Sequence, residues 1–170
     1  MHQKKYALEV LKRYKMEECN LAKSPIEFGL KLGAGLDEKP VDATLFKQMV
    51  GSLRYLCHSR LDIAYGVGLV SRYMNDPRTS HMAATKRILR YVKGTLDYGL
   101  LFSKANHNQG IRLIGFSDAD WSGDVEDNKN TTGYVFKLLG STICWSSKKH
   151  EDVGLSTCES GYMAAASAAC

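Results

Sequence analysis

The chain has 170 residues, of which 44% are hydrophobic and 24% charged, proportions typical of a folded globular protein rather than a disordered one. No apolar run approaches the roughly 20 residues that cross a bilayer, and the first residues do not resemble a signal peptide, so no membrane partner is expected. The five cysteines are scattered and odd in number, which favours reduced thiols in an intracellular protein of the cytoplasm or nucleus.

Charge is unevenly distributed along the chain. Residues 1–104 carry 18 basic and 10 acidic side chains, a net charge of +8, whereas residues 105–170 carry 5 and 8, a net charge of −3. A basic part beside an acidic part indicates two units with different roles, divided between residues 104 and 105. The basic part suits a polyanion such as nucleic acid, although solvated helix faces explain the same excess equally well.

Residues 1–104 are predicted to be helical because apolar side chains recur there at helical spacing. The expected helices cover residues 3–16, 43–59, 63–74 and 81–93, and the last three follow the candidate N-cap residues Asp42, Asp62 and Ser80. Gly66 and Gly68 weaken the third helix unless a neighbour packs close to them. The second helix is expected to face the core through a stripe of four residues, Leu45, Met49, Leu53 and Leu56.

The last of these helices carries four basic residues and no acidic one: Lys86, Arg87, Arg90 and Lys93. They are candidate nucleic-acid-binding residues, because a row of cations on one helix can follow a phosphate backbone and bind it with salt-dependent affinity. The alternative is that long basic side chains simply cover a surface. This alternative is slightly favoured, because aromatic side chains for base stacking are not interleaved with the row.

Strands and one helix are expected after Gly94, so the fold class is α+β. The predicted strands are residues 96–102, 111–117, 132–139 and 142–146, with turns at residues 106–110 and 140–141 and a final helix capped by Ser156 or Thr157. The strand at 111–117 is followed at once by Asp118, whose carboxylate, at the end of a buried strand, could hold Mg²⁺. An acidic loop that is merely solvated is the alternative, and this stretch alone favours it.

Seven stretches form an ordered and specific set: 3–8 (QKKYAL), 39–44 (KPVDAT), 50–56 (VGSLRYL), 62–65 (DIAY), 86–100 (KRILRYVKGTLDYGL), 117–121 (SDADW), and 156–157 (ST) followed by 162–164 (YMA). Along nearly its whole length the chain thereby resembles the Pol polyprotein of copia-type LTR retrotransposons. The resemblance implies that residues 1–104 correspond to the helical thumb and connection region of a reverse transcriptase. Residues 105–170 would be the incomplete first part of an RNase H-like domain, a truncated mixed sheet with one helix.

RNase H in that family cuts the RNA strand of an RNA–DNA hybrid with four carboxylates and two Mg²⁺ ions. Asp118 matches the first carboxylate, but the position of the second is Gly161. Glu159 lies about 200° away from it around a helix, so it does not substitute. The remaining carboxylates of the pattern, and those of the polymerase, fall outside residues 1–170. The resemblance therefore implies a fragment that is inactive alone and binds no Mg²⁺, with Asp118 a vestigial site.

Two further hypotheses remain open. Residues 87–90 read R-x-L-R, the translocation motif of secreted oomycete effectors, so an effector that suppresses defence inside a host plant cell is the first alternative. A non-catalytic remnant that still binds nucleic acid through its basic part is the second. In addition, the strand at 111–117 would lack its parallel neighbour in the RNase H fold. Such an exposed edge favours marginal stability and self-association.

Overall fold

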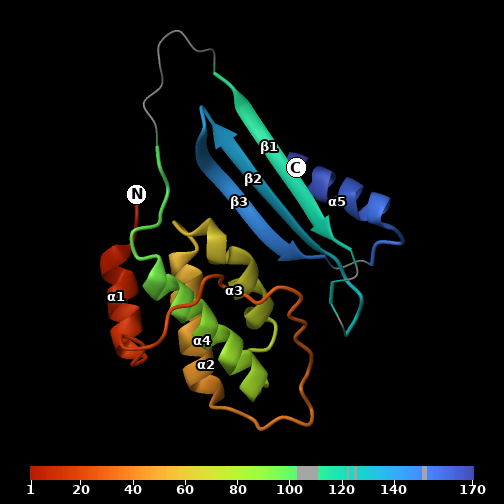
Figure 1. Ribbon diagram of the computed structural model, residues 1–170. Helices are drawn as coiled ribbons and strands as arrows, with labels where there is room; N and C mark the ends of the chain where they lie inside the picture. Colours follow the sequence, from red (N-terminus) through yellow and green to blue (C-terminus); the bar gives the residue numbers. More distant parts are fainter. Residues whose placement is uncertain (103–110, 122, 125, 151–152) are drawn as a thin grey trace. The chain divides into compact units, whose positions relative to one another are not determined.

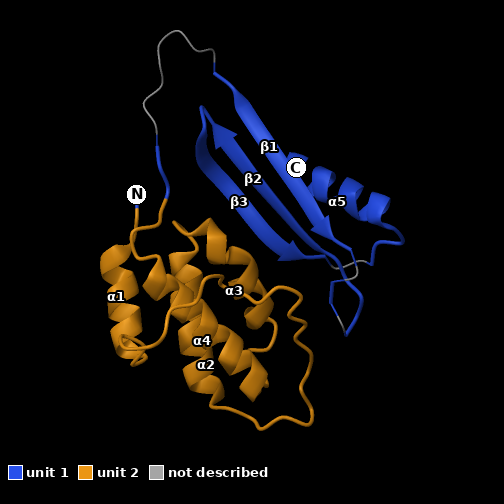
Figure 2. Ribbon diagram, viewed as in Figure 1, with its two compact units in different colours: residues 1, 100–170 blue, residues 2–99 orange. Residues whose placement is uncertain are grey.

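The computed structural model describes residues 1–102, 111–121, 123–124, 126–150 and 153–170 (Figure 1). The chain separates into two compact units, a helical unit of residues 2–99 and a sheet unit of residues 100–170 together with Met1 (Figure 2). Helices alone form the first unit, and a sheet with one helix forms the second, which confirms the α+β class. The predicted boundary between residues 104 and 105 lies outside the described residues.

The helical unit contains all four predicted helices. They are α1 (Lys4–Arg13), α2 (Ala43–Leu56), α3 (Ala64–Ser71), which is preceded by the short 3-10 helix η1 (Leu61–Ile63), and α4 (Thr79–Gly94). The start of α2 is as predicted, because the Asp42 carboxylate accepts hydrogen bonds from the backbone N–H groups of Thr44 (2.8 Å) and Leu45 (3.1 Å). This cap satisfies two of the free donors at the helix N-terminus.

The predicted caps of α3 and α4 are both wrong, and at α4 a tertiary contact replaces the local one. Asp62 does not cap α3, because its carboxylate is taken by the guanidinium of Arg60 and residues 61–63 form a 3-10 turn instead. Ser80 does not cap α4, which already begins at Thr79. The acceptor there is the distant Glu38 carboxylate, which receives the Ser80 N–H (2.7 Å) and the Thr79 hydroxyl (2.8 Å). These bonds, led by the Ser80 N–H, lower the pKa of Glu38.

The apolar faces of α1 to α4 meet in one core. The fully buried side chains of this core include Val10, Phe46, Val50, Leu53, Ile63, Val70, Ile88, Leu89 and Val92. The predicted stripe of α2 is right for three of its four members, whereas Leu45 is 39% exposed and Phe46 takes the core position next to it. Helical spacing accommodates either residue, so the pattern alone did not separate them.

A neighbouring segment packs closely against α3 at Gly66, as the sequence analysis required for a glycine within this helix. A Cβ atom at this position would lie 2.7 Å from Cγ1 of Ile26, which belongs to the segment between α1 and α2. The glycine therefore lowers the helix propensity of α3 but allows this segment to approach the helix.

The sheet unit contains the strands β1 (Leu113–Asp120), β2 (Thr131–Leu138) and β3 (Ser141–Lys149), followed by α5 (Thr157–Ala169). The strands pair antiparallel in the order β1-β2-β3, so among the described residues β1 has a strand neighbour on one side only. Helix α5 packs against β1 and β2 (Figure 1). Its predicted cap is confirmed, because the Ser156 hydroxyl accepts the Glu159 N–H at 3.1 Å.

Three details of the sheet unit correct the sequence prediction. Residues 96–102 form no strand, since residues 95–97 continue as a turn after α4 and the next residues are irregular. The turn between β2 and β3 is Leu139-Gly140, one residue earlier than predicted, and both residues have positive φ, +50° and +82°, as in a type I′ hairpin. Asp118 lies inside β1 rather than beyond its end, because the strand continues to Asp120. The turn expected at residues 106–110 lies outside the described residues.

Candidate functional site

Asp118, the candidate metal ligand, is an exposed residue of β1 paired with Gly133 of β2. One of its carboxylate oxygens accepts the N–H of the next residue, Ala119, at 2.9 Å. Across the described parts of the chain, no three His, Cys, Asp or Glu side chains lie together as a metal site requires. Among the described residues Asp118 therefore belongs to no such cluster, whereas a pair of Mg²⁺ ions takes several carboxylates.

The two positions on α5 that matter for this site behave differently. Gly161 has no atom within 4 Å of the place where a Cβ would stand, so the backbone leaves room for a side chain there. Glu159 is instead occupied at the helix end, where its carboxylate accepts the Leu155 N–H at 2.5 Å. With the Ser156 cap this forms a reciprocal arrangement like a capping box, so Glu159 serves the helix.

The acidic residues that follow β1 form an ion-pair cluster rather than a metal site. The ammonium group of Lys149 on β3 lies 2.6 Å from the buried Asp124 carboxylate and 2.8 Å from that of Asp127. The hydrogen bond from Lys149 is the main cause that lowers the pKa of Asp127. Desolvation acts to lower the pKa of Lys149, but its bonds to the two carboxylates outweigh this effect and raise it. The cluster thus fastens the loop between β1 and β2 to β3.

The four basic residues of α4 differ in their surroundings, because three of them bind the segment of residues 19–27, which we call the strap. The guanidinium of Arg87 contacts the Glu27 carboxylate at 2.6 Å and the Ser24 hydroxyl at 3.2 Å. Arg90 donates to the Asn20 carbonyl at 2.8 Å, and Lys93 donates to the Cys19 carbonyl at 2.7 Å. Lys86 is exposed. Most of the predicted phosphate-binding row is therefore already occupied by acceptors from the same chain.

The R-x-L-R motif lies in the middle of α4. Its two apolar residues, Ile88 and Leu89, are fully buried in the helical core. Its two arginines are the ones that hold the strap. In the folded chain, therefore, the motif is a structural part of a packed helix.

Comparison with known proteins shows relatives along almost the whole chain. The "Retrovirus-related Pol polyprotein from transposon RE2" of Arabidopsis thaliana is 38% identical over 166 residues, which are 98% of this chain and 11% of that protein. The corresponding polyprotein from transposon TNT 1-94 of Nicotiana tabacum is 38% identical over 172 aligned residues, covering 97% of this chain and 13% of its own length. The chain is similar to these transposon Pol polyproteins over almost its whole length.

The chain spans about a tenth of the length of the Pol polyproteins that it matches. The "Secreted RxLR effector protein 161" of Plasmopara viticola is also similar, with 47% identity over 116 residues, 68% of this chain and 80% of that protein. No protein-family model matches the chain, and no solved structure is similar enough to count as a match. Within the described residues, no helix is long and apolar enough to cross a membrane.

Two buried polar clusters of the chain were missed by the sequence reasoning. Arg60 is almost fully buried, chelates the Asp62 carboxylate (2.8 Å) and donates to the carbonyl (3.0 Å) and hydroxyl (2.6 Å) oxygens of Thr95. Its guanidinium also lies 5.6 Å from the ring centres of Tyr91 and Tyr98. The adjacent Arg-Leu-Asp triplet was the only local signal of this pair.

The second cluster surrounds His81, which is fully buried in α4. Its Nδ1 accepts the Arg78 N–H at 2.9 Å, so the neutral ring carries its proton on Nε2, which contacts the Gly33 carbonyl at 2.8 Å. The ring stacks on Tyr73 at 3.9 Å between centroids. These contacts hold His81 within the fold. Gly33 is distant from His81 in the sequence, so the sequence pattern does not indicate the cluster.

Proposed function

We propose that this chain is a portion of a copia-type Pol polyprotein that covers the thumb and connection region of the reverse transcriptase and the beginning of the RNase H domain. The ordered set of seven motifs supports this assignment, as does the division into a helical unit and a sheet unit. In the intact parent, this region would take part in RNA-dependent DNA synthesis and in cleavage of the RNA strand of an RNA–DNA hybrid. The chain would then act inside the cell, in the cytoplasm or nucleus.

Alone, this chain cleaves no hybrid and synthesises no DNA. One observation carries this part of the proposal: where the RNase H pattern places its second carboxylate, α5 has Gly161, and the nearest acid, Glu159, is bound to the helix N-terminus. Two metal ions stabilise the attacking and leaving oxygens only when several carboxylates bind and position both ions. An exposed Asp118 without them has the charge of an ordinary surface residue and no means to align a reaction.

The test is Mg²⁺-dependent cleavage of an end-labelled RNA–DNA hybrid, with Asp118→Asn as the matched control. The expected result is that the wild-type chain and the Asp118→Asn variant give the same background over a range of Mg²⁺ concentrations. A Gly161→Glu variant, which the backbone accommodates, should remain at background too, because two of the four carboxylates are still missing. Cleavage by the wild-type chain that disappears in Asp118→Asn overturns the proposal.

Binding of nucleic acid without chemistry is the second candidate, and the net charge of +8 in residues 1–104 favours it. A helix that carries Lys86, Arg87, Arg90 and Lys93 offers phosphate contacts and no base-specific ones, so binding should be independent of sequence. A gel shift with an RNA–DNA hybrid tests it. The affinity should fall steeply as salt rises, and an affinity that does not change with salt contradicts an interface made of cations.

The effector hypothesis receives less support from this fold. A translocation motif must be accessible, whereas Ile88 and Leu89 of R-x-L-R are buried and the arginines are bound to the strap. The similarity to the transposon Pol polyproteins covers 97–98% of this chain, whereas that to the effector from Plasmopara viticola covers 68%. Suppression of cell death on expression in leaves, lost when both arginines are replaced by lysine, would favour the effector instead.

A further inference from the structure

Three basic side chains of α4 are bound by acceptors of the strap, so this charged surface is occupied by the chain itself. Three cations of α4 meet four acceptors of the strap: the Cys19 and Asn20 carbonyls, the Ser24 hydroxyl and the Glu27 carboxylate. Donor groups of this kind bind phosphate oxygens in nucleic-acid complexes. The strap therefore occupies the same hydrogen-bonding positions that a phosphate backbone along α4 would take.

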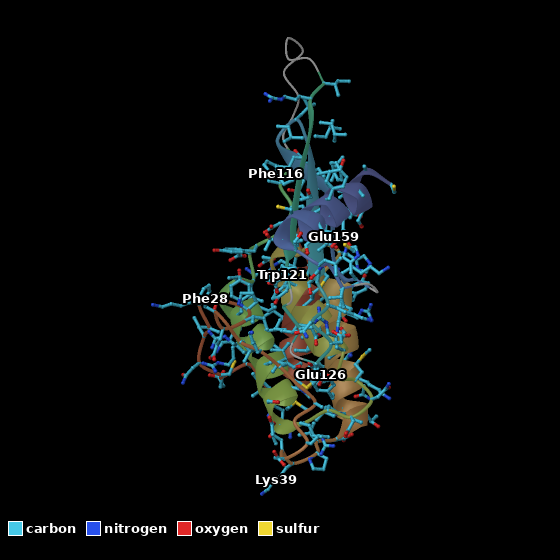
Figure 3. All side chains as sticks on the ribbon, turned by 90° about the vertical axis from the view of Figure 1, so that its right-hand side faces the viewer. Phe28, Lys39, Phe116, Trp121, Glu126 and Glu159 are labelled. Atoms are coloured by element: carbon cyan, nitrogen blue, oxygen red, sulfur yellow. The ribbon has the colours of Figure 1, made fainter. Side chains whose placement is uncertain are left out.

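The side chain of Glu27, at the end of the strap, is held by a single ion pair with Arg87. Glu27 is the one charged acceptor, and its side chain is 61% exposed. The Nε atom of Arg87 is buried, yet it has no hydrogen-bond partner among the described residues. Phe28, the next residue, projects fully exposed from the chain (Figure 3). A guanidinium with an unused donor gains a bond when a phosphate with several free oxygens replaces a single carboxylate.

One apolar residue of the strap is anchored in the helical core. Ile26 packs against this core and lies close to Gly66 of α3, whereas Leu21 lies beside Gly94 at the end of α4 but is 60% exposed. The strap thus has an apolar anchor at Ile26 and, next to it, an electrostatic contact at Glu27. Release of Glu27 exchanges one exposed ion pair of Arg87 for another. Such surface pairs contribute little to stability.

We propose that the strap is an intramolecular shield over the basic row of α4, and that nucleic-acid phosphate competes with Glu27 and the strap carbonyls for Arg87, Arg90 and Lys93. This inference rests on the proposed nucleic-acid binding and adds its regulation: the free chain binds weakly because its own strap fills the site. The partner is a phosphate backbone, and Lys86, which lies outside the strap contacts, makes the first encounter.

Charge-matched variants test the electrostatic contact at Glu27. Glu27→Gln and Glu18→Gln each remove one negative charge, but Glu18 is exposed and no strap contact involves it. Fluorescence anisotropy with a labelled RNA–DNA hybrid at low salt should show Glu27→Gln binding about fivefold more tightly than Glu18→Gln, with a salt slope steeper by about one phosphate contact. Equal affinities for the two variants overturn the shield while leaving nucleic-acid binding intact. If neither variant nor the wild-type chain binds, the proposed interface fails and the shield fails with it.

Hydrogen exchange provides a readout that simple surface binding would not produce. The Ala22 N–H bonds to the Arg90 carbonyl at 3.5 Å, so exchange of the strap amides reports whether the strap lies on α4. Addition of hybrid should accelerate exchange in residues 19–27 severalfold while the amides of α2 stay unchanged. Protection of the strap on binding would mean that nucleic acid covers it rather than displaces it, and would overturn the proposal.

Discussion

The helical unit and the sheet unit differ most in how they bury apolar side chains. Among the described residues, every buried hydrophobic side chain except Leu100 and Ala164 belongs to the helical unit. The sheet unit instead leaves large apolar residues such as Leu113, Phe116 and Ile143 half exposed. Apolar burial is the dominant favourable term in folding, so the helical unit has a core of its own and the sheet unit depends mainly on its strand hydrogen bonds.

The buried polar groups show the same difference. In the sheet unit the interior is largely polar and includes Asn130, whose amide donates to the Ser160 hydroxyl at 2.9 Å. In the helical unit, buried polar residues such as Arg60 and His81 sit within an apolar core. The comparison indicates a protein with one self-sufficient unit and one unit that needs more chain, or a partner, to complete its packing.

The largest effect expected from this comparison concerns two phenylalanines. Phe46 of α2 is fully buried and Phe116 of β1 is 57% exposed. Phe46→Ala should destabilise the helical unit by about 3–5 kcal/mol, whereas Phe116→Ala should cost the sheet unit less than about 1 kcal/mol. Circular dichroism at 222 nm follows all the helices in urea, most of which belong to the helical unit, and Trp121 and Trp145 report on the sheet unit. Coincident unfolding of both signals in the wild-type chain would contradict the independence of the two units.

The next effect concerns the buried guanidinium of Arg60. Arg60→Ala should destabilise the helical unit by roughly 2–4 kcal/mol, because it leaves Asp62 without its partner and empties the space between two tyrosine rings. Lys4→Ala is the control: its pair with Asp97 has a similar separation, 2.7 Å, but both side chains are exposed, and its loss should cost under about 1 kcal/mol. Equal urea midpoints for the two variants would show that burial of the pair does not matter.

The same pair predicts how stability depends on pH. Burial acts to raise the pKa of Asp62, but hydrogen bonds and charge from Arg60 outweigh it, so the pKa is lowered in the folded chain. A carboxylate with a lowered pKa stabilises the fold above its unfolded pKa of about 4, and this contribution is lost as pH falls through the folded value. Urea midpoints measured by circular dichroism between pH 6 and pH 2 should therefore fall less steeply for Arg60→Ala than for the wild-type chain.

A smaller effect is expected at the free edge of the sheet. Since β1 pairs only with β2 among the described residues and exposes Leu113 and Phe116, we expect the chain to self-associate through this edge. Ser117→Lys places a charge on the edge strand and should weaken association about tenfold. Sedimentation velocity over a range of concentrations measures it, with Ser167→Lys at an exposed position of α5 as the control, because β3 is the other edge strand of the sheet. A wild-type chain that sediments as a monomer at every concentration rules the association out.

The sequence predicted an element well wherever its signals are local. Helix α2 was recognised because its cap, Asp42, directly precedes it, and α5 because Ser156 does the same. The start of α4 was missed because its acceptor, Glu38, comes from some forty residues earlier, and no pattern within a helix indicates such a contact. The strand expected at residues 96–102 was wrong for a related reason: apolar residues there follow α4 as a turn, and short apolar runs do not distinguish the two.

The candidate sites were predictable only as residue types. The basic row of α4 was visible from the sequence, but its acceptors are backbone carbonyls of Cys19 and Asn20, which any residue supplies. The sequence predicted Asp118 at the end of a strand, because the apolar run before it ends clearly. It did not predict that the strand continues past Asp118, since the pairing of Asp118 with Gly133 on β2 depends on the register of the whole hairpin.

The smallest expected effect lies in the turn between β2 and β3, and it acts on the less stable unit alone. Leu139 has a φ of +50°, a conformation that Asn and Gly adopt readily and that a branched apolar residue disfavours. Gly140 follows with a φ of +82°. Leu139→Asn creates the Asn-Gly pair that type I′ turns prefer and should stabilise the sheet unit by about 0.5–1 kcal/mol. Gly140→Ala should cost it about 1 kcal/mol in the opposite direction. Tryptophan fluorescence in urea should register both shifts while the signal of the helical unit stays fixed, because the turn belongs to the sheet unit. Movement of the helical midpoint by either substitution would mean that the two units unfold as one.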